Sequence, residues 1–449
     1  MTIPATTLRA PAPPAQPTRV TWGCGPVARM TRPNSHLVVA PLGSSRGIFF
    51  QPERYVAAFA RVAARAKGRA REALLPFLHD GPRFARCVAA AVADGSYRPR
   101  PATLHTVRLD KERVLFQLDV VDRVVHDVVA QILVEAMEPR LSPHLWSYRA
   151  GRSALGAVRG LRDVLRAHCR ERPDPRTRGL HVLRCDVAAY GDSIPMDEGS
   201  PLWGDLAEVL GEVSPLVAGV VRPPVLGADG RIAPVERGVP TGSPMATALA
   251  NLYLMRLDRE LGEIPGAFYA RYGDDLCLAH PDAAVVDEAE RALRAHLAGR
   301  GLALNERKRV RSFWNGAGRG EGGTRHVTFL GIRLGWDGAL GLPRSKAREL
   351  LGEVRRRLGQ AVRLAEPAER LAAARDAVAD ALDPRSPLAA PHVATIFQRL
   401  DDREQLAALD ELVRLAAAES LSGRRGVRAF RELPPRRLAL SSLVAQRNR

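Results

Sequence analysis

Short apolar runs separated by turn residues occupy the middle of the 449-residue chain. The apolar positions of Phe268–Tyr272 and Asp275–Leu278 predict two strands, and Gly273-Asp274 predicts a tight turn between them, because glycine reaches positive φ without strain. Residues 182–187 form another apolar run, which predicts a short buried strand with Asp186 near its end. The pattern therefore predicts a sheet in which acidic residues stand where strands end.

An apolar period of three to four residues predicts helices before and after this sheet in the sequence. Before the sheet, residues 52–92 and 119–137 have this period, and an extended hairpin is expected over residues 96–118. After the sheet, the pattern is helical over Lys346–Leu364, Ala368–Leu382 and Glu404–Ser420. This mixture of helices and strands predicts a fold of the α+β class.

Three carboxylates stand at the predicted strand ends. Asp274 and Asp275 are adjacent, and the apolar strands around them strengthen their mutual repulsion unless a cation neutralises them. If the strand of residues 182–187 lies beside them, Asp186 completes an all-oxygen site of the kind that Mg²⁺ prefers. Taken alone, the acidic pair also fits a solvated hairpin tip. The third carboxylate favours the metal site.

Charge and cysteine content narrow the class of protein. The net charge of +18 indicates a polyanionic partner, although a GC-rich coding sequence would also enrich arginine. The five cysteines lack CxxC spacing, which argues against a zinc module or a disulfide scaffold and for the cytoplasm. Cys185 and Cys277 flank the acidic site, and we expect them to be packing residues rather than metal ligands. Residues 1–45 lack a long apolar core, so we expect a flexible arm rather than a signal peptide or membrane span.

Seven segments between residues 90 and 345 resemble, in the same order, motifs of reverse transcriptases, in particular the group II intron-like and retron-like enzymes of bacteria. Asp186-Val-Ala-Ala-Tyr-Gly-Asp-Ser-Ile194 resembles the first aspartate motif, and Tyr272-Gly-Asp-Asp275 resembles the YxDD turn. The other segments resemble two fingers motifs, the PQG-type loop, the lysine motif and the hairpin that holds the primer end: Asp119–Asp127, Ser147–Ser153, Gly238–Met245, Gly301–Lys308 and Phe329–Ile332. A YGDD turn alone is a weak signal, whereas seven ordered segments are a strong one.

The resemblance implies a right-hand polymerase fold with fingers, an antiparallel-sheet palm and a helical thumb. We expect the fingers at residues 46–180, the palm at 181–343, and the thumb with a C-terminal extension at 344–449. The loop and helix of residues 238–254 would return to the junction of fingers and palm. The implied activity is that of an RNA-directed DNA polymerase, a nucleotidyltransferase that uses an RNA template, a nucleic-acid primer and nucleoside triphosphates. A role in phage defence, a cognate non-coding RNA and the absence of a membrane partner are further expectations, whereas the oligomeric state is not indicated.

The resemblance also assigns roles to individual residues. The implied catalytic residues are Asp186, Asp274, Asp275 and Lys308. Two Mg²⁺ ions, with Mn²⁺ as an alternative, would be held by Asp186, the main-chain carbonyl of Val187, Asp274 and Asp275. The residues expected to contact the nucleotide are Lys111, Arg113, Tyr190, Gly191, Thr241 and Gly242. The residues expected to contact template or primer are Arg149, Arg152, Tyr272, Leu330 and Gly331.

Three positions depart from the family pattern. Thr241 stands where the loop usually carries Gln, and Gly273 stands where Ala, Val or Met is usual. Gly191 stands where a bulky aromatic side chain normally excludes the sugar 2′-hydroxyl. Either this gate is open, or Tyr190 or a side chain from another segment closes it. Two alternatives therefore stay open: a polymerase that accepts ribonucleotides or makes untemplated product, and a non-catalytic RNA-binding scaffold, against which the complete set of four catalytic residues speaks.

Overall fold

The computed structural model describes residues 46–108, 112–227 and 229–444, and the expected N-terminal arm lies outside these ranges. The described residues group into one compact unit, so the boundaries expected near residues 180 and 343 stay predictions. Within the described ranges, no helix combines the length and the apolar character needed to cross a membrane.

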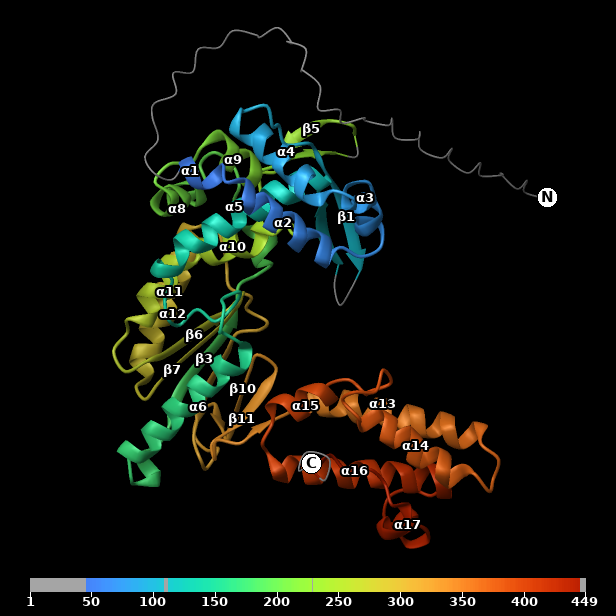
Figure 1. The fold of residues 1–449 in the computed structure, drawn as a ribbon. Helices are drawn as coiled ribbons and strands as arrows, with labels where there is room; N and C mark the ends of the chain where they lie inside the picture. Colours follow the sequence, from blue (N-terminus) through green and yellow to red (C-terminus); the bar gives the residue numbers. More distant parts are fainter. Residues whose placement is uncertain (1–45, 109–111, 228, 445–449) are drawn as a thin grey trace, which may run out of the picture. The chain divides into compact units, whose positions relative to one another are not determined.

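A five-stranded sheet with strand order β6-β7-β3-β8-β9 carries the three carboxylates at strand ends and in a turn. Its strands β3, β6 and β7 are labelled in Figure 1. Its strands are β3 (Leu180–Asp186), β6 (Phe268–Tyr272), β7 (Asp275–His280), β8 (Val310–Trp314) and β9 (Gly323–Thr324). Neighbouring strands are antiparallel, except β8 and β9, which are parallel. The predicted hairpin around position 273 and the predicted strand that ends near Asp186 are both confirmed.

The side chains of this sheet alternate between two hydrophobic cores, because successive residues of a strand point to opposite faces. Leu183 and Cys185 belong to one core, whereas Val182 and Cys277 belong to the other. Helices that contribute to the first core are α10 (Met245–Tyr253), α11 (Met255–Gly262) and α12 (Ala283–Gly299). Helix α6 (Ala154–Glu171) contributes to the second core. Both cysteines are buried, as expected for packing residues, and burial raises the pKa of their thiols to about 12.

The segments before β3 are mainly helical and pack around α5 (Val120–Met137), which is buried on most of its surface. The other helices of the N-terminal half are α1 (Arg46–Phe49), α2 (Pro52–Arg65), α3 (Arg69–Leu78), α4 (Gly81–Ala93) and the short η1 (Glu138–Arg140) and η2 (Pro175–Thr177). The predicted hairpin forms as β1 (Ala102–Arg108) and β2 (Glu112–Gln117). A later segment adds α7 (Tyr190–Ser193), α8 (Pro201–Leu210), α9 (Pro215–Val221), β4 (Pro224–Leu226) and β5 (Ile232–Pro234). Strand β4 pairs with β1, so residues far apart in the sequence share one four-stranded sheet.

The C-terminal helices attach to a small antiparallel sheet. Its strands are β10 (His326–Phe329), β11 (Ile332–Gly335) and β12 (Leu340–Gly341). The helices are α13 (Arg344–Leu364), α14 (Arg370–Leu382), α15 (Val393–Arg399), α16 (Arg403–Ser422), α17 (Val427–Glu432) and α18 (Pro435–Leu438). The side-chain amide of Gln405 on α16 bonds to both backbone groups of Leu342, at 2.5 and 2.8 Å. The predicted helical C-terminal region is therefore confirmed.

Candidate active site

The three carboxylates meet at the ends of neighbouring strands. Asp186 is the last residue of β3, and Asp275, the first residue of β7, lies opposite it in the antiparallel register. Gly273 adopts φ +65° in the turn before β7, where a side chain would be strained. The amide of Val187 donates a hydrogen bond of 3.1 Å to the carbonyl of Asp274, which ties the turn to the end of β3. The site predicted from the sequence pattern is therefore brought together by strand pairing.

Lys308 and Asn305 hold the carboxylate of Asp186 from a third segment. The ammonium of Lys308 lies 2.6 Å from Oδ2 of Asp186, and the side-chain amide of Asn305 donates to Oδ1 at 3.0 Å. The backbone amide of Asn305 also donates to the carbonyl of Asp186 at 2.8 Å. Asn305 was not singled out in the sequence, where only its place in the lysine motif marks it.

The electrostatics of the site favour a bound cation. Burial, with the charges of Asp274 and Asp186, raises the pKa of Asp275 to about 6. Burial is also the main cause that raises the pKa of Asp274 above its ordinary value. The hydrogen bond to Asp186 raises the pKa of Lys308, so this side chain keeps its proton. Lys308 and Arg184 offset these effects only in part, since the pKa values of both Asp274 and Asp275 stay raised.

The donor set fits a hard divalent cation, because carboxylate oxygens are the ligands that Mg²⁺ prefers. Asp186, Asp274 and Asp275 offer only oxygen atoms, and burial together with the neighbouring carboxylates raises the pKa of the last two. As they lie, the side chains of the described residues do not form a group of three His, Cys, Asp or Glu that would hold a metal. The fit thus rests on donor chemistry and charge.

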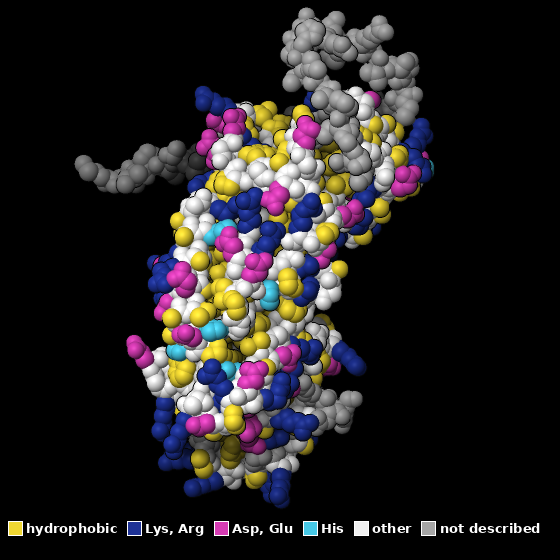
Figure 2. Space-filling model, turned by 90° about the vertical axis from the view of Figure 1, so that its left-hand side faces the viewer, with side chains coloured by type: hydrophobic (Ala, Val, Ile, Leu, Met, Phe, Trp, Pro, Cys, Tyr) yellow, Lys and Arg dark blue, Asp and Glu magenta, His cyan; other side chains and the backbone are white. Residues whose placement is uncertain are grey.

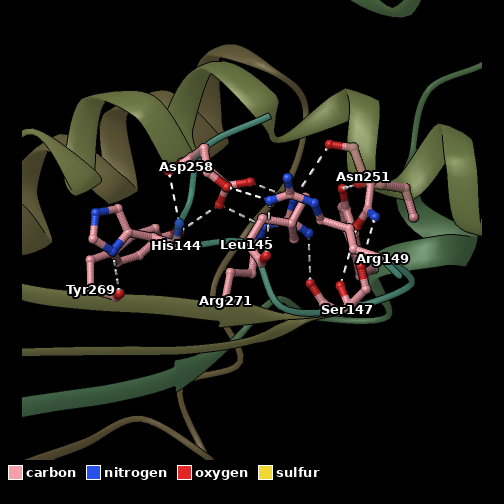
Figure 3. Close-up of polar contacts among 12 residues, drawn as sticks. His144, Leu145, Ser147, Arg149, Asn251, Asp258, Tyr269 and Arg271 are labelled. Carbon is pink, nitrogen blue, oxygen red and sulfur yellow. Dashed lines mark hydrogen bonds and ion pairs between the residues drawn. The ribbon is translucent and has the colours of Figure 1, made fainter. Parts of the chain in front are cut away.

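A buried ion pair between Arg271 and Asp258 lies next to the turn that carries Asp274 (Figure 3). The guanidinium of Arg271 and the carboxylate of Asp258 are fully buried, with an N–O distance of 2.6 Å. Arg271 also donates to the carbonyl of Gly273 at 3.0 Å, and the hydroxyl of Tyr269 donates to Asp258 at 2.8 Å. Helix α11 therefore fixes the turn that carries Asp274 through two charged side chains. No local sequence pattern indicates this pairing.

The loop before α6 is attached to the same strand. Asn251 on α10 donates to the carbonyl of Ser147 at 3.0 Å, and backbone bonds join Arg271 to both His144 and Trp146 (Figure 3). The guanidinium of Arg149 is largely buried and donates to Glu138 at 2.6 Å and to the carbonyl of Ser142 at 2.7 Å. Arg149, expected to contact the template, is instead committed to holding this loop, because its donors are used within the protein.

Arg152 lies on the same loop in a half-buried position. Its guanidinium is 4.7 Å from the ring centroid of Trp146 and donates to the carbonyl of Pro143 at 2.9 Å. These contacts orient Arg152 but leave part of its surface exposed. Its expected contact with the template stays a prediction.

Two residues are expected near the nucleotide sugar. Tyr190 lies in the core, whereas Gly191 has no side chain. Tyr190 is buried, and its hydroxyl donates to the carbonyl of Ala250, so its side chain is not available to a nucleotide as placed. A Cβ added at Gly191 would have Val239 as its nearest neighbour, at 3.7 Å, which is ordinary contact. The expectation that Tyr190 contacts the nucleotide is therefore corrected, because packing against α10 turns its side chain inward. The side chain of Tyr190 therefore does not take the place of the missing side chain at Gly191.

The loop that precedes α10 is anchored to elements of the N-terminal half by hydrogen bonds. The amide of Phe116 on β2 donates to the carbonyl of Thr241 at 2.8 Å, and Gly242 adopts φ +95° beside it. The imidazole of His126 on α5 shares a hydrogen bond of 2.8 Å with the hydroxyl of Ser243. Burial lowers the pKa of His126 to about 3, so this side chain is neutral.

A cavity of about 550 Å³ lies beside this loop and is lined by both β2 and α3. Gly242 and the half-buried Arg123 contribute to its wall. Of the two cations expected on the hairpin, Lys111 lies outside the described residues, and only the backbone of Arg113 is described, as part of β2. Arg123 therefore supplies a positive charge at this cavity that was not singled out in the sequence.

The hairpin expected to hold the primer end turns at Leu330-Gly331, between β10 and β11. Leu330 has φ +49°, a conformation that is strained for a residue with a branched side chain, and Gly331 has φ +71°. The ammonium of Lys346 on α13 donates to the carbonyl of Gly331 at 3.2 Å. Tyr272 is half-buried and pairs with Asp275 across the other hairpin. Contacts of Tyr272, Leu330 and Gly331 with nucleic acid stay predictions.

Comparison with known proteins links this site to one family. The family model described as "Reverse transcriptase (RNA-dependent DNA polymerase)" matches residues 104–334, slightly more than half of the chain. No curated protein matches. A structure of telomerase from Candida albicans in complex with a TWJ fragment of telomeric RNA is similar, at 12% identity and a TM-score of 0.44, over 72% of this chain and 60% of that chain. Apo telomerase from Candida tropicalis, truncated from its C-terminal domain, is similar at 12% identity and a TM-score of 0.42, over 54% and 55% of the two chains. The chain thus spans less than two thirds of either telomerase.

Proposed function

The chain belongs to the reverse transcriptase family, and from this premise we propose that it copies an RNA template into DNA at the site formed by Asp186, Asp274, Asp275 and Lys308. The observation that carries the proposal is the meeting of Asp186 and Asp275 in register at the ends of β3 and β7, with Lys308 bound to Asp186 at 2.6 Å. A scaffold without activity would have no need of three neighbouring carboxylates, two of which have raised pKa values even with Lys308 beside them.

Divalent metal is the implied cofactor of this reaction, with two Mg²⁺ ions as our proposal. When bound, the metal would activate the primer 3′-hydroxyl and neutralise the phosphate oxygens. Asp186 and Asp274 would be its main ligands, with Asp275 and the carbonyl of Val187 as further ligands expected from the family. The crowded carboxylates, with pKa values raised by burial and mutual charge, support this assignment.

Lys308 has a separate part in the proposed mechanism. Its pKa is raised by Asp186, so the ammonium keeps its proton while one carboxylate holds it in place. A positioned ammonium can supply both positive charge and a proton to a leaving pyrophosphate. Asn305 keeps Asp186 oriented by its bond to Oδ1, so that Oδ2 remains directed at Lys308.

The nucleotide would enter beside Gly242, where the β2 hairpin, the loop of Thr241 and the cavity with Arg123 adjoin. A half-buried guanidinium at a cavity suits phosphate, because charge-assisted bonds strengthen away from bulk water. Direct contacts of Thr241, Gly242, Lys111 and Arg113 with the nucleotide belong to this proposal.

A second candidate function is a polymerase that accepts ribonucleotides. Gly191 favours it, because this residue has no side chain, an added Cβ would have its nearest neighbour at 3.7 Å, and Tyr190 is turned into the core. A 2′-hydroxyl would then meet no side chain at the place where the family normally excludes it. Untemplated synthesis stays the remaining alternative to copying.

Primer extension on a defined RNA template, followed by sequencing of the product, tests the proposed function. The proposal expects deoxynucleotide product complementary to the template. Product unrelated to the template would indicate untemplated synthesis instead, and absence of any product would contradict the proposal. Location in the cytoplasm, a cognate non-coding RNA and a role in phage defence stay predictions, of which the last can be tested by plaque counts with and without the gene.

A further inference from the structure

The short helices α17 and α18 form the most basic surface segment of the C-terminal region. Residues 424–437 contain six arginines and one acidic residue, Glu432. The arginines, all exposed, are Arg424, Arg425, Arg428, Arg431, Arg436 and Arg437. We call these six residues the C-terminal arginine surface.

This segment is docked rather than loosely attached. Ala429 and Leu438 are fully buried in the second hydrophobic core. The amide of Gly426 donates to Glu419 on α16 at 2.9 Å, and the guanidinium of Arg375 on α14 donates to the carbonyl of Leu438 at 2.8 Å. The inward residues thus fix α17 and α18 to the helices beneath them, while the arginines point away from this core.

Five of the six charges of this surface have no ion-pair partner among the described residues. Its one ion pair among the described residues joins Arg424 to Glu432 at 3.7 Å, and the other five guanidiniums have no carboxylate within ion-pair distance in that part of the chain. Six like charges on so short a segment repel one another, which is unfavourable unless a polyanion binds.

The arginines around α12, in contrast, form ion pairs with acidic residues. Arg291, Arg294 and Arg311 pair with Glu288, Glu290 and Asp287. Over much of the face drawn in Figure 2, Lys or Arg and Asp or Glu side chains are interspersed. Five exposed arginines of residues 424–437 therefore lack an ion-pair partner among the described residues, unlike the three arginines around α12.

We propose that the C-terminal arginine surface is a second RNA-binding site, which binds the phosphate backbone of RNA outside the primer–template duplex held at the catalytic site. Arginine suits this role because its planar guanidinium binds phosphate oxygens in pairs. The choice of RNA rather than another polyanion rests on the proposed function, in which RNA is the template. Backbone contacts of this kind give affinity and position without reading sequence.

The test uses the full chain and three matched proteins: the wild type, the variant Arg425→Gln/Arg428→Gln/Arg431→Gln, and the control Arg291→Gln/Arg294→Gln/Arg311→Gln. Both variants lose the same formal charge, but only the first loses unpaired arginines. Affinity for a long blunt-ended RNA duplex is measured as a function of salt concentration. Extension of a short primer–template checks that the catalytic site is intact.

We expect the first variant to bind the RNA duplex about tenfold more weakly at moderate salt, with a salt slope reduced by about 2–3, because each lost phosphate contact removes nearly one released counterion. We expect the control to stay within about twofold of the wild type, since its arginines are already neutralised. Extension of the short primer–template should be unchanged in both.

Equal weakening in both variants would overturn the proposal, because net charge alone would then explain binding. Unchanged RNA affinity in the first variant would also overturn it, as would competition by polyglutamate as strong as by RNA, or a larger loss for a DNA duplex than for RNA. A wild type that binds RNA through this surface but extends no primer would contradict the proposed function and leave this inference standing.

Discussion

The ammonium of Lys308 lies 2.6 Å from Oδ2 of Asp186, so a positive charge from the segment after α12 neutralises the carboxylate at the end of β3. The two side chains have different roles in the proposed mechanism. The carboxylate of Asp186 would bind metal, and the ammonium of Lys308 would supply charge and a proton to the leaving pyrophosphate. Three acidic side chains and one ammonium share the site, and burial raises the pKa of Asp275 to about 6. The remaining negative charge makes a divalent cation the natural occupant.

Replacing Lys308 tests its part in the chemistry. We expect Lys308→Ala to lower the single-turnover rate of incorporation by about 10²-fold or more, as for loss of a general acid. Lys308→Arg should retain more activity than Lys308→Ala, because it keeps the charge beside Asp186. Rates are measured at saturating nucleotide. A rate of Lys308→Ala equal to that of the wild type would contradict the role of this side chain.

The buried pair of Arg271 and Asp258 should matter both for stability and for the geometry of the turn. Asp258→Asn leaves a fully buried guanidinium without its counter-charge, which should lower the free energy of unfolding by about 3–5 kcal/mol. The apolar double variant Asp258→Leu/Arg271→Met should recover much of that loss. Denaturant unfolding measures both changes.

The same double variant shows whether Arg271 positions the turn that carries Asp274 or only stabilises the fold. It removes the donor to the carbonyl of Gly273, so we expect a lower rate of incorporation with little change in the KM for nucleotide. Wild-type rates in a stably folded double variant would show that Arg271 supports the fold alone.

His126 should make stability depend on pH. Its pKa is about 3 in the folded protein and about 6.5 when unfolded, so only the unfolded chain takes up a proton as the pH falls through about 6.5. This residue should therefore lower the free energy of unfolding by about 1.4 kcal/mol between about pH 7.5 and about pH 5.5. Its contribution is fully present above that range and is lost as the pH decreases.

The variant His126→Gln isolates this contribution, because glutamine can still bond to Ser243 but does not titrate. We expect its unfolding free energy to fall by about 1.4 kcal/mol less than that of the wild type over the same pH range. The same decrease in both proteins would mean that other groups account for the pH dependence.

Gly191 should determine sugar selectivity. We expect weak discrimination against ribonucleotides in the wild type, and Gly191→Phe should raise it by about 1–3 kcal/mol, or roughly 10–200-fold, as for other steric differences in a pocket. A Cβ at this position would make only ordinary contact with its nearest neighbour, Val239, at 3.7 Å. Competition of a ribonucleotide with its deoxy counterpart in single-turnover extension measures this. Strong selectivity for the deoxy sugar in the wild type would place the gate elsewhere.

The local sequence pattern was sufficient to predict the strands that carry Asp186 and Asp275. An alternating apolar run and a Gly-Asp turn define the hairpin of residues 268–280, and Asp186 ends an apolar run. Strand pairing then places Asp186 opposite Asp275, which follows from antiparallel register once the two strands are neighbours. Lys308 was assigned through family resemblance, and its ion pair with Asp186 agrees with that assignment.

Residues whose roles depend on distant packing could not be assigned in this way. Tyr190 is turned inward because its hydroxyl finds the carbonyl of Ala250, a partner about sixty positions away in the sequence. The guanidinium of Arg149 donates to Glu138, in a loop whose path no local sequence pattern specifies. Asp258 and Arg271 lie on a helix and a strand, and only their burial together makes them a pair. Such contacts are set by tertiary structure, which a single sequence does not display.

The central claim is that Asp274 is a metal ligand of a polymerase, and incorporation by the variant Asp274→Asn tests it most directly. Extension of a primer on an RNA template in Mg²⁺ is compared among the wild type, Asp274→Asn and the control Asp163→Asn, which changes an exposed acid on α6. Melting without metal confirms the fold, and it should be unchanged or higher in Asp274→Asn, because one of the crowded charges is removed. The account predicts that Asp274→Asn incorporates no nucleotide while the control matches the wild type. Full incorporation by a folded Asp274→Asn protein would contradict it.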